Sequence, residues 1–108
     1  MEPSALEQDW ILSTLGDDPD LGEIVEMFVD EMPERIALLT ACRDEEDWQQ
    51  LGRLAHQLKG SCGSYGFSQL TSQAARLEQV CRSKERIEEQ IFAELSELVD
   101  MCQRVKAR

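Results

Sequence analysis

Apolar residues recur at intervals of three and four along most of this chain, and that spacing places them on one face of an α-helix. The pattern predicts helices over about residues 4–15, 19–43, 47–64, 69–82 and 85–106. The apolar stripes predicted to face the core include Trp10, Leu21, Ile24, Val25, Phe28 and Ile87. No stretch shows the alternation of a β-strand. Four long amphipathic helices with short connections predict an all-α fold, an antiparallel four-helix bundle with a short additional N-terminal helix.

Local residues set the predicted ends and bends of these helices. Asp18 and Pro19 are typical of an N-cap followed by proline in the first turn, so the second helix is predicted to start there. Pro33 lies inside that helix and should bend it, although two separate helices that meet at Pro33 are the alternative. The acidic turn 44–47 supplies N-cap candidates for the third helix, and Ser68 can cap the fourth.

The only histidine, His56, is predicted to lie on the opposite side of the third helix from the apolar stripe. At about 100° per residue, the residues within about 60° of it around the helix are Gln49, Gly52, Arg53, Lys59, Gly60 and Gly63. A glycine inside a helix costs about 0.5–1 kcal/mol relative to alanine, so the glycines on this side need a reason. Clearance for a large partner that must reach the imidazole explains Gly60, one turn after His56. For Gly63 and Gly66 a second interpretation, that they only loosen the end of the helix, stays open.

Charge is distributed unevenly along the 108 residues, which we expect to form a single domain over residues 1–108. The net charge is −11, and residues 1–50 hold 15 of the 22 acidic residues but only 2 of the 11 basic ones. An acidic chain without a basic patch argues against binding to nucleic acid or to anionic membranes. Around His56, however, Arg53 and Lys59 make the surface locally positive.

Neither a membrane span nor an export signal is predicted, since no apolar run approaches the roughly 18 residues that a span needs. The four cysteines lack metal-ligand or CxxC spacing. Three of them fall on predicted apolar faces, where a free cysteine behaves as a small hydrophobic residue. We therefore expect reduced thiols and a cytoplasmic protein.

The residues around His56 argue against several kinds of chemistry. A metal site needs a second histidine or paired carboxylates, but Lys59 and Gly60 occupy the positions three and four residues on. A nucleophile triad is not predicted, because no acid lies one turn away along the helix to orient the imidazole. The chain has no glycine-rich phosphate loop, and a convex helix face offers no pocket for acid–base catalysis. We expect no metal and no other cofactor.

An exposed imidazole fits one remaining role, that of a nucleophile toward a group delivered by another protein. Near pH 7 imidazole is partly neutral, so one ring nitrogen has a free lone pair without an activating base. Phosphoryl transfer depends mainly on positioning and electrostatics, which a partner with a metal ion can supply. Lys59, one turn from His56, can approach the phosphoryl oxygens as a point charge.

The sequence around the histidine resembles that of histidine-containing phosphotransfer (HPt) domains. The resemblance is carried by His56-Gln57-Leu58-Lys59-Gly60-Ser61, by Ala55 and Gly66 beside this segment, and by Leu70 and Leu77-Glu78 in the next helix. HPt domains are four-helix bundles that shuttle phosphoryl groups between aspartates of response-regulator receiver domains, without an ATP site of their own. The resemblance implies that His56 is the phosphoacceptor, that Lys59 lies close to the phosphate and that Gly60 admits the receiver. Cys62 stands where a second serine is common in the family; it projects inward, so only a packing change is expected.

The resemblance thus predicts a phosphorelay intermediate of two-component signal transduction, which takes a phosphoryl group from one receiver aspartate and passes it to another receiver. The expected partners are receiver domains, a hybrid sensor histidine kinase, or both, and we expect a monomer. The predicted docking residues are Gln49, Gly52, Arg53, Gln57, Gly60 and Gly63. The alternative is a helical adaptor that binds a receiver or kinase without carrying phosphate, but His56, Lys59 and Gly60 are all intact. The phosphoacceptor domain of a chemotaxis-type kinase would share the fold and would also need a catalytic module.

Overall fold

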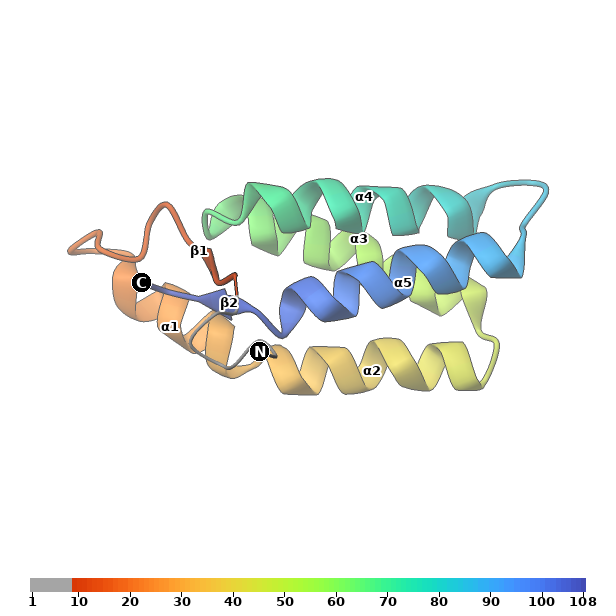
Figure 1. Ribbon diagram of the computed structural model, residues 1–108, viewed down its shortest axis with the longest axis horizontal. Coiled ribbons are helices and arrows are strands. Elements are labelled where there is room, and N and C mark those ends of the chain that lie inside the picture. Colours follow the sequence, from red (N-terminus) through yellow and green to blue (C-terminus); the bar gives the residue numbers. More distant parts are fainter. Residues whose placement is uncertain (1–8) are drawn as a thin grey trace, which may run out of the picture.

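A computed structural model describes residues 9–108 of the chain (Figure 1). Its elements in chain order are β1 (Ile11–Leu12), α1 (Gly22–Asp30), α2 (Met32–Asp44), α3 (Trp48–Ser64), α4 (Ser68–Arg82), α5 (Glu88–Cys102) and β2 (Val105–Lys106). Figure 1 shows the four long helices α2 to α5 running along the long axis of the molecule, with α1 at one end. The predicted all-α fold with a bundle of four long helices is confirmed, but the short additional helix, α1, is not the N-terminal helix that was predicted.

The core lies between the long helices, and the predicted stripes of α3, α4 and α5 supply most of it. Leu51, Ala55, Leu77 and Leu98 are completely buried. Removing a leucine-sized side chain from water contributes about 1.5–3 kcal/mol, so this shared core holds the three helices together. None of the helices in the described part of the chain is long and apolar enough to cross a membrane.

A helix was predicted over about residues 4–15. For residues 9–15 this prediction is wrong, because they are not helical, and residues 4–8 lie outside the described part of the chain. Instead, β1 pairs in parallel with β2, with Ile11 opposite Val105. The amide of Ile11 donates to the carbonyl of Arg104 at 2.8 Å. Both paired residues are buried and β-branched, which favours extended backbone. The last helix consequently ends at Cys102 rather than near residue 106.

The second predicted helix, 19–43, is in fact two helices, which corresponds to the less favoured alternative. The break falls at Glu31, whose amide bonds to carbonyls at the end of α1. Pro33 lies in the first turn of α2, where its missing amide costs no helix hydrogen bond. Asp18 accepts two backbone amide hydrogen bonds and caps the turn that leads into α1.

α1 is inclined to α2 (Figure 1), and only part of its predicted stripe faces the core. Val25 and Phe28 are buried, as predicted. Four apolar residues that were predicted to face the core are exposed instead: Trp10, Leu21, Ile24 and Ile87. The last of these precedes α5, because that helix begins at Glu88 and not near residue 85.

The two ends of α3 are fixed by local hydrogen bonding and by one glycine. The side chain of Asp47 accepts a hydrogen bond from an amide of the first turn, as the acidic turn predicted. At the other end Gly66 has φ +83°, a left-handed conformation that glycine adopts without strain. A Cβ there would lie 2.7 Å from Ser13 Oγ, so the segment after β1 packs against this turn. The predicted Ser68 cap is wrong: Ser68 is the first residue of α4, after Phe67.

All four cysteines are free and buried. Burial raises the pKa of Cys62 and Cys102 to about 12 and that of Cys81 to about 11. These thiols therefore stay protonated at neutral pH and behave as small apolar side chains. Cys62 faces the core, as its projection predicted.

Candidate functional site

His56 lies in the middle of α3 and its side chain is 59% exposed. The neighbouring Ala55 and Leu58 are buried, so the histidine is on the outer side of the helix, as predicted. It lines a shallow, open hollow together with Gln57, Gly60, Ser61, Ser64 and Tyr65. A large partner therefore has direct access to the imidazole.

A carboxylate from the neighbouring helix contacts the imidazole. Glu78 of α4 places Oε2 at 2.9 Å from His56 Nδ1, and its own side chain is only 11% exposed. α3 itself contains no acidic residue, so its sequence alone did not predict this orienting group. The signal for this residue in the sequence was the Leu77-Glu78 pair of the HPt resemblance, which carried no predicted role for Glu78.

The same carboxylate also binds two cationic side chains. Lys59 Nζ lies 2.8 Å from Glu78 Oε1, and Arg82 Nη1 lies 2.6 Å from Glu78 Oε2. The pKa of Glu78 is lowered mainly by the hydrogen bond from Lys59, against the effect of burial, with further lowering by His56 and by the charge of Arg82. Glu78 is therefore an anion at neutral pH.

An ionised carboxylate only accepts hydrogen bonds, so it fixes the tautomer of a neutral imidazole. The proton must lie on His56 Nδ1, which donates it to Glu78. The lone pair of the neutral ring is then on Nε2, which makes no hydrogen bond with the residues described. Whenever the imidazole is neutral, its nucleophilic nitrogen is therefore the unoccupied Nε2.

The glycines of α3 divide into two kinds. At Gly60 a Cβ would meet no atom within 4 Å, which agrees with the clearance interpretation. At Gly52 it would lie 3.4 Å from Cys81 Cβ, and Gly52 is buried. The prediction that Gly52 faces solvent is therefore wrong, and its small size serves the close approach of α3 and α4. Gly63 is exposed, with Thr71 Oγ1 at 3.6 Å from its Cβ position.

The remaining predicted docking residues are all exposed but are not all in one place. Gln57 and Gly60 line the hollow around His56. Gln49 and Arg53 lie nearer the start of α3, where they line a second hollow with Cys81, Arg82 and Arg86. Among residues 9–108 no group of three or more histidine, cysteine or acidic side chains is arranged to hold a metal ion.

Comparison with known families agrees with the geometry of this site. The chain has no significant match among curated proteins or among solved structures. The family model of the Hpt domain, however, matches residues 23–108, which include His56, Lys59 and Glu78 as well as all five helices except the first residue of α1. The match covers most of the chain, and the chain therefore belongs to the Hpt domain family.

Proposed function

We propose that His56 is the phosphoacceptor of this Hpt domain, which takes a phosphoryl group from a receiver aspartate and passes it to a second receiver. Hpt domains are phosphocarriers of two-component phosphorelays, have no kinase ATP site of their own, and interact with receiver domains and histidine kinases. The observation that carries the proposal is the hydrogen bond between His56 Nδ1 and buried Glu78, because it leaves Nε2 free on an exposed face.

In the proposed step, the Nε2 lone pair of His56 attacks the phosphorus of the receiver's aspartyl phosphate. A P–N bond forms, the P–O bond of the acyl phosphate breaks, and its electron pair leaves on the aspartate carboxylate. The Nδ1 proton stays on the ring and remains donated to Glu78. Transfer to a second receiver is the same step in reverse, with a different aspartate as acceptor.

Glu78 supports this step electrostatically as well as by orientation. A phosphorylated imidazole that keeps its Nδ1 proton gains positive charge on the ring, and the adjacent carboxylate offsets it at 2.9 Å. Lys59 is held by the same carboxylate, 34% exposed and one turn from His56. We expect its ammonium group to contact the phosphoryl oxygens once they arrive.

The direct test is incubation of the purified protein with a phosphorylated receiver domain, followed by intact-mass measurement. We expect a gain of one acid-labile phosphate, mapped to His56. A stable complex with the receiver but no gain in mass would instead support an adaptor that never carries phosphate.

A further inference from the structure

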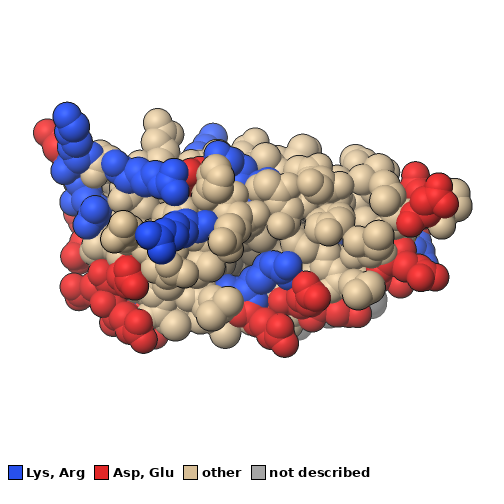
Figure 2. Space-filling view, turned by 180° about the vertical axis from the view of Figure 1, so that it is seen from behind, with Lys and Arg blue, Asp and Glu red and all other residues tan. Residues whose placement is uncertain are grey.

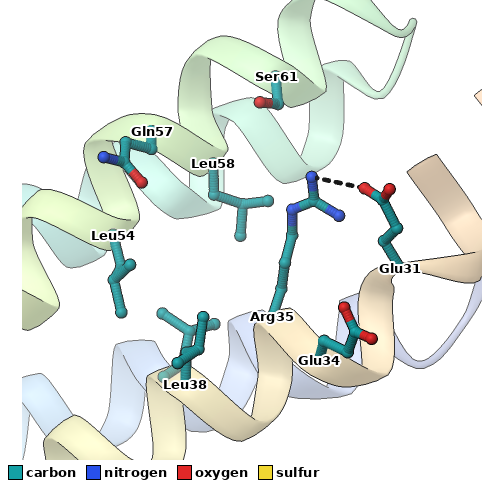
Figure 3. A pocket seen from close by; sticks show the side chains of 9 residues that line it. Glu31, Glu34, Arg35, Leu38, Leu54, Gln57, Leu58 and Ser61 are labelled. Atoms are coloured by element: carbon teal, nitrogen blue, oxygen red, sulfur yellow. Dashed lines mark ion pairs between the residues drawn. The ribbon is translucent and has the colours of Figure 1, made fainter.

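Two unlike surfaces flank His56. The first, the apolar flank, is a hollow of about 390 Å³ between α2 and α3 whose lining includes Leu38, Leu54 and Leu58. Figure 3 shows Leu38 of α2 and Leu54 and Leu58 of α3 pointing toward one another across it. An ion pair of 3.1 Å between Glu31 and Arg35 lies at the end of this hollow where Ser61 is found (Figure 3).

The apolar flank is continuous with the surface around the histidine. Gln57 and Ser61 line both this hollow and the one that contains His56. Leu38 is 56% exposed, so part of the apolar lining is in contact with water. A protein surface that covers His56 and extends across Gln57 and Ser61 would reach Leu38, and burying it would add favourable apolar contact.

The second surface, the arginine flank, lies on the other side of α3. Arg53, Arg82 and Arg86 line a hollow with Gln49, beside the end of α4. Figure 2 shows Lys and Arg side chains gathered at the end of this face of the molecule that holds the α4–α5 connection, next to a broad uncharged area. On a chain with a net charge of −11, such a cluster is the place where an acidic partner surface meets attraction instead of repulsion.

We propose that the two flanks fix one orientation of the docked receiver: an aliphatic side chain enters the apolar flank, and an acidic surface covers the arginine flank. This inference rests on the proposed function, since it concerns the partner that covers His56. The reverse orientation would place carboxylates beside Glu31 and Glu34, which line the apolar flank, and would bury arginine against apolar atoms. Like-charge contacts and an unpaired buried charge make that arrangement unfavourable.

The apolar contact is tested by comparing Leu38→Gln with Leu12→Gln. Leu12 is 54% exposed, close to the 56% of Leu38, but lies on β1. The receiver used is the one that phosphorylates the wild-type protein fastest in a panel of purified receiver domains. We expect Leu38→Gln to weaken its binding about tenfold, as loss of an interface anchor does, and Leu12→Gln to leave binding unchanged.

The charged contact is tested by comparing Arg86→Glu with Arg76→Glu. Both arginines are exposed, and Arg76 lies about 200° around α4 from Glu78, on the far side of that helix. We expect Arg86→Glu to slow transfer on the order of fivefold at low ionic strength, with the difference shrinking as salt is added. Arg76→Glu carries the same change of charge and should have no such effect.

Phosphorylation of His56 by phosphoramidate, a small donor that needs no docking, separates the two proposals. All four variants should be labelled by it at the wild-type rate. If Leu38→Gln and Leu12→Gln changed receiver binding equally, or Arg86→Glu and Arg76→Glu changed transfer equally, the proposed orientation would be overturned. The proposed function would stand as long as the wild-type protein still accepted phosphate. A wild-type protein that takes phosphate from neither phosphoramidate nor any receiver would overturn the proposed function and the orientation with it.

Discussion

The two sides of α3 differ in how closely the next helix approaches. On the α4 side the helices are so close that a Cβ at Gly52 would already contact Cys81 and Arg82, and Glu78 is nearly buried. On the α2 side a hollow remains, and Leu38 is more than half exposed. Close packing holds the groups that act on the imidazole, because their geometry must be fixed. The open side has no such task and is available to a partner.

The largest effect is expected at His56, the point where both sides meet. His56→Gln should abolish phosphate uptake, since no other histidine exists in the chain. The side chain is mostly exposed, so the free energy of unfolding should change by no more than about 0.5 kcal/mol. Intact mass and thermal unfolding measure the two quantities. Phosphate uptake by the variant at the wild-type rate would exclude His56 as the acceptor.

Replacing Glu78 tests whether a residue on the closely packed α4 side of α3 controls the rate of phosphoryl transfer. Glu78→Leu removes the partner of Nδ1 and should slow transfer about ten- to hundredfold, the range found when a group that orients a metal-ligating histidine is lost. Glu78→Gln keeps an acceptor for Nδ1 but loses the negative charge. Its transfer rate should therefore lie between those of Glu78→Leu and the wild type. Rates of labelling by phosphoramidate and by a receiver measure this. A merely structural role predicts that unfolding changes while both labelling rates do not.

Lys59→Ala should reduce transfer about tenfold without abolishing it, because one charge-assisted contact to the phosphoryl group is lost. The phosphohistidine formed by the variant should also have a shorter lifetime. Both are measured by following the phosphorylated species over time after the donor is removed. Equal rates and equal lifetimes in variant and wild type would remove Lys59 from the mechanism.

Gly60 and Gly52 differ in the space around them, so the same substitution at both positions tests the difference between the open and the closely packed parts of the α3 surface. Gly60→Gln meets open space and should raise the free energy of unfolding by about 0.5–1 kcal/mol, because glutamine favours the helix. Transfer from a receiver should slow, while phosphoramidate labelling continues. Gly52→Gln should destabilise the bundle by about 1–3 kcal/mol, because its side chain overpacks the α3–α4 contact. If the melting temperatures of both variants shifted in the same direction, Gly60 and Gly52 would not differ in packing as described.

The smallest effect is a dependence of stability on acid. The pKa of Glu78 is lowered in the folded protein, mainly by Lys59, so its stabilising contribution is present above the pKa of an unfolded glutamate, about 4.3. That contribution is lost as the pH falls through the folded value. The difference in free energy of unfolding between wild type and Glu78→Gln should therefore narrow below about pH 4. Denaturant unfolding at several pH values measures it; a constant difference would mean that Glu78 is not held as an anion.

Sequence reasoning succeeded where one segment determines its own structure. α3 and α4 were predicted to within a residue, because periodicity and the Asp47 cap are local signals. Glu78 was missed as the orienting group because its contact with His56 crosses from one helix to another. Two separate helices were only the less favoured alternative for residues 19–43, because the apolar stripe runs through the break at Glu31 and spacing alone does not report a change of axis.

The short pairing of β1 with β2 joins residues that are more than ninety positions apart, Ile11 and Val105. Closing so long a loop is entropically costly, so this contact should form late in folding and open before the bundle does. Its opening would also release Thr14, whose amide donates to the carbonyl of Gly66 at 3.0 Å, directly after α3. Amide hydrogen exchange should therefore be faster in β1, β2 and Thr14 than in α3, α4 and α5, and the helix that carries His56 should keep its slow exchange while the ends of the chain separate and rejoin.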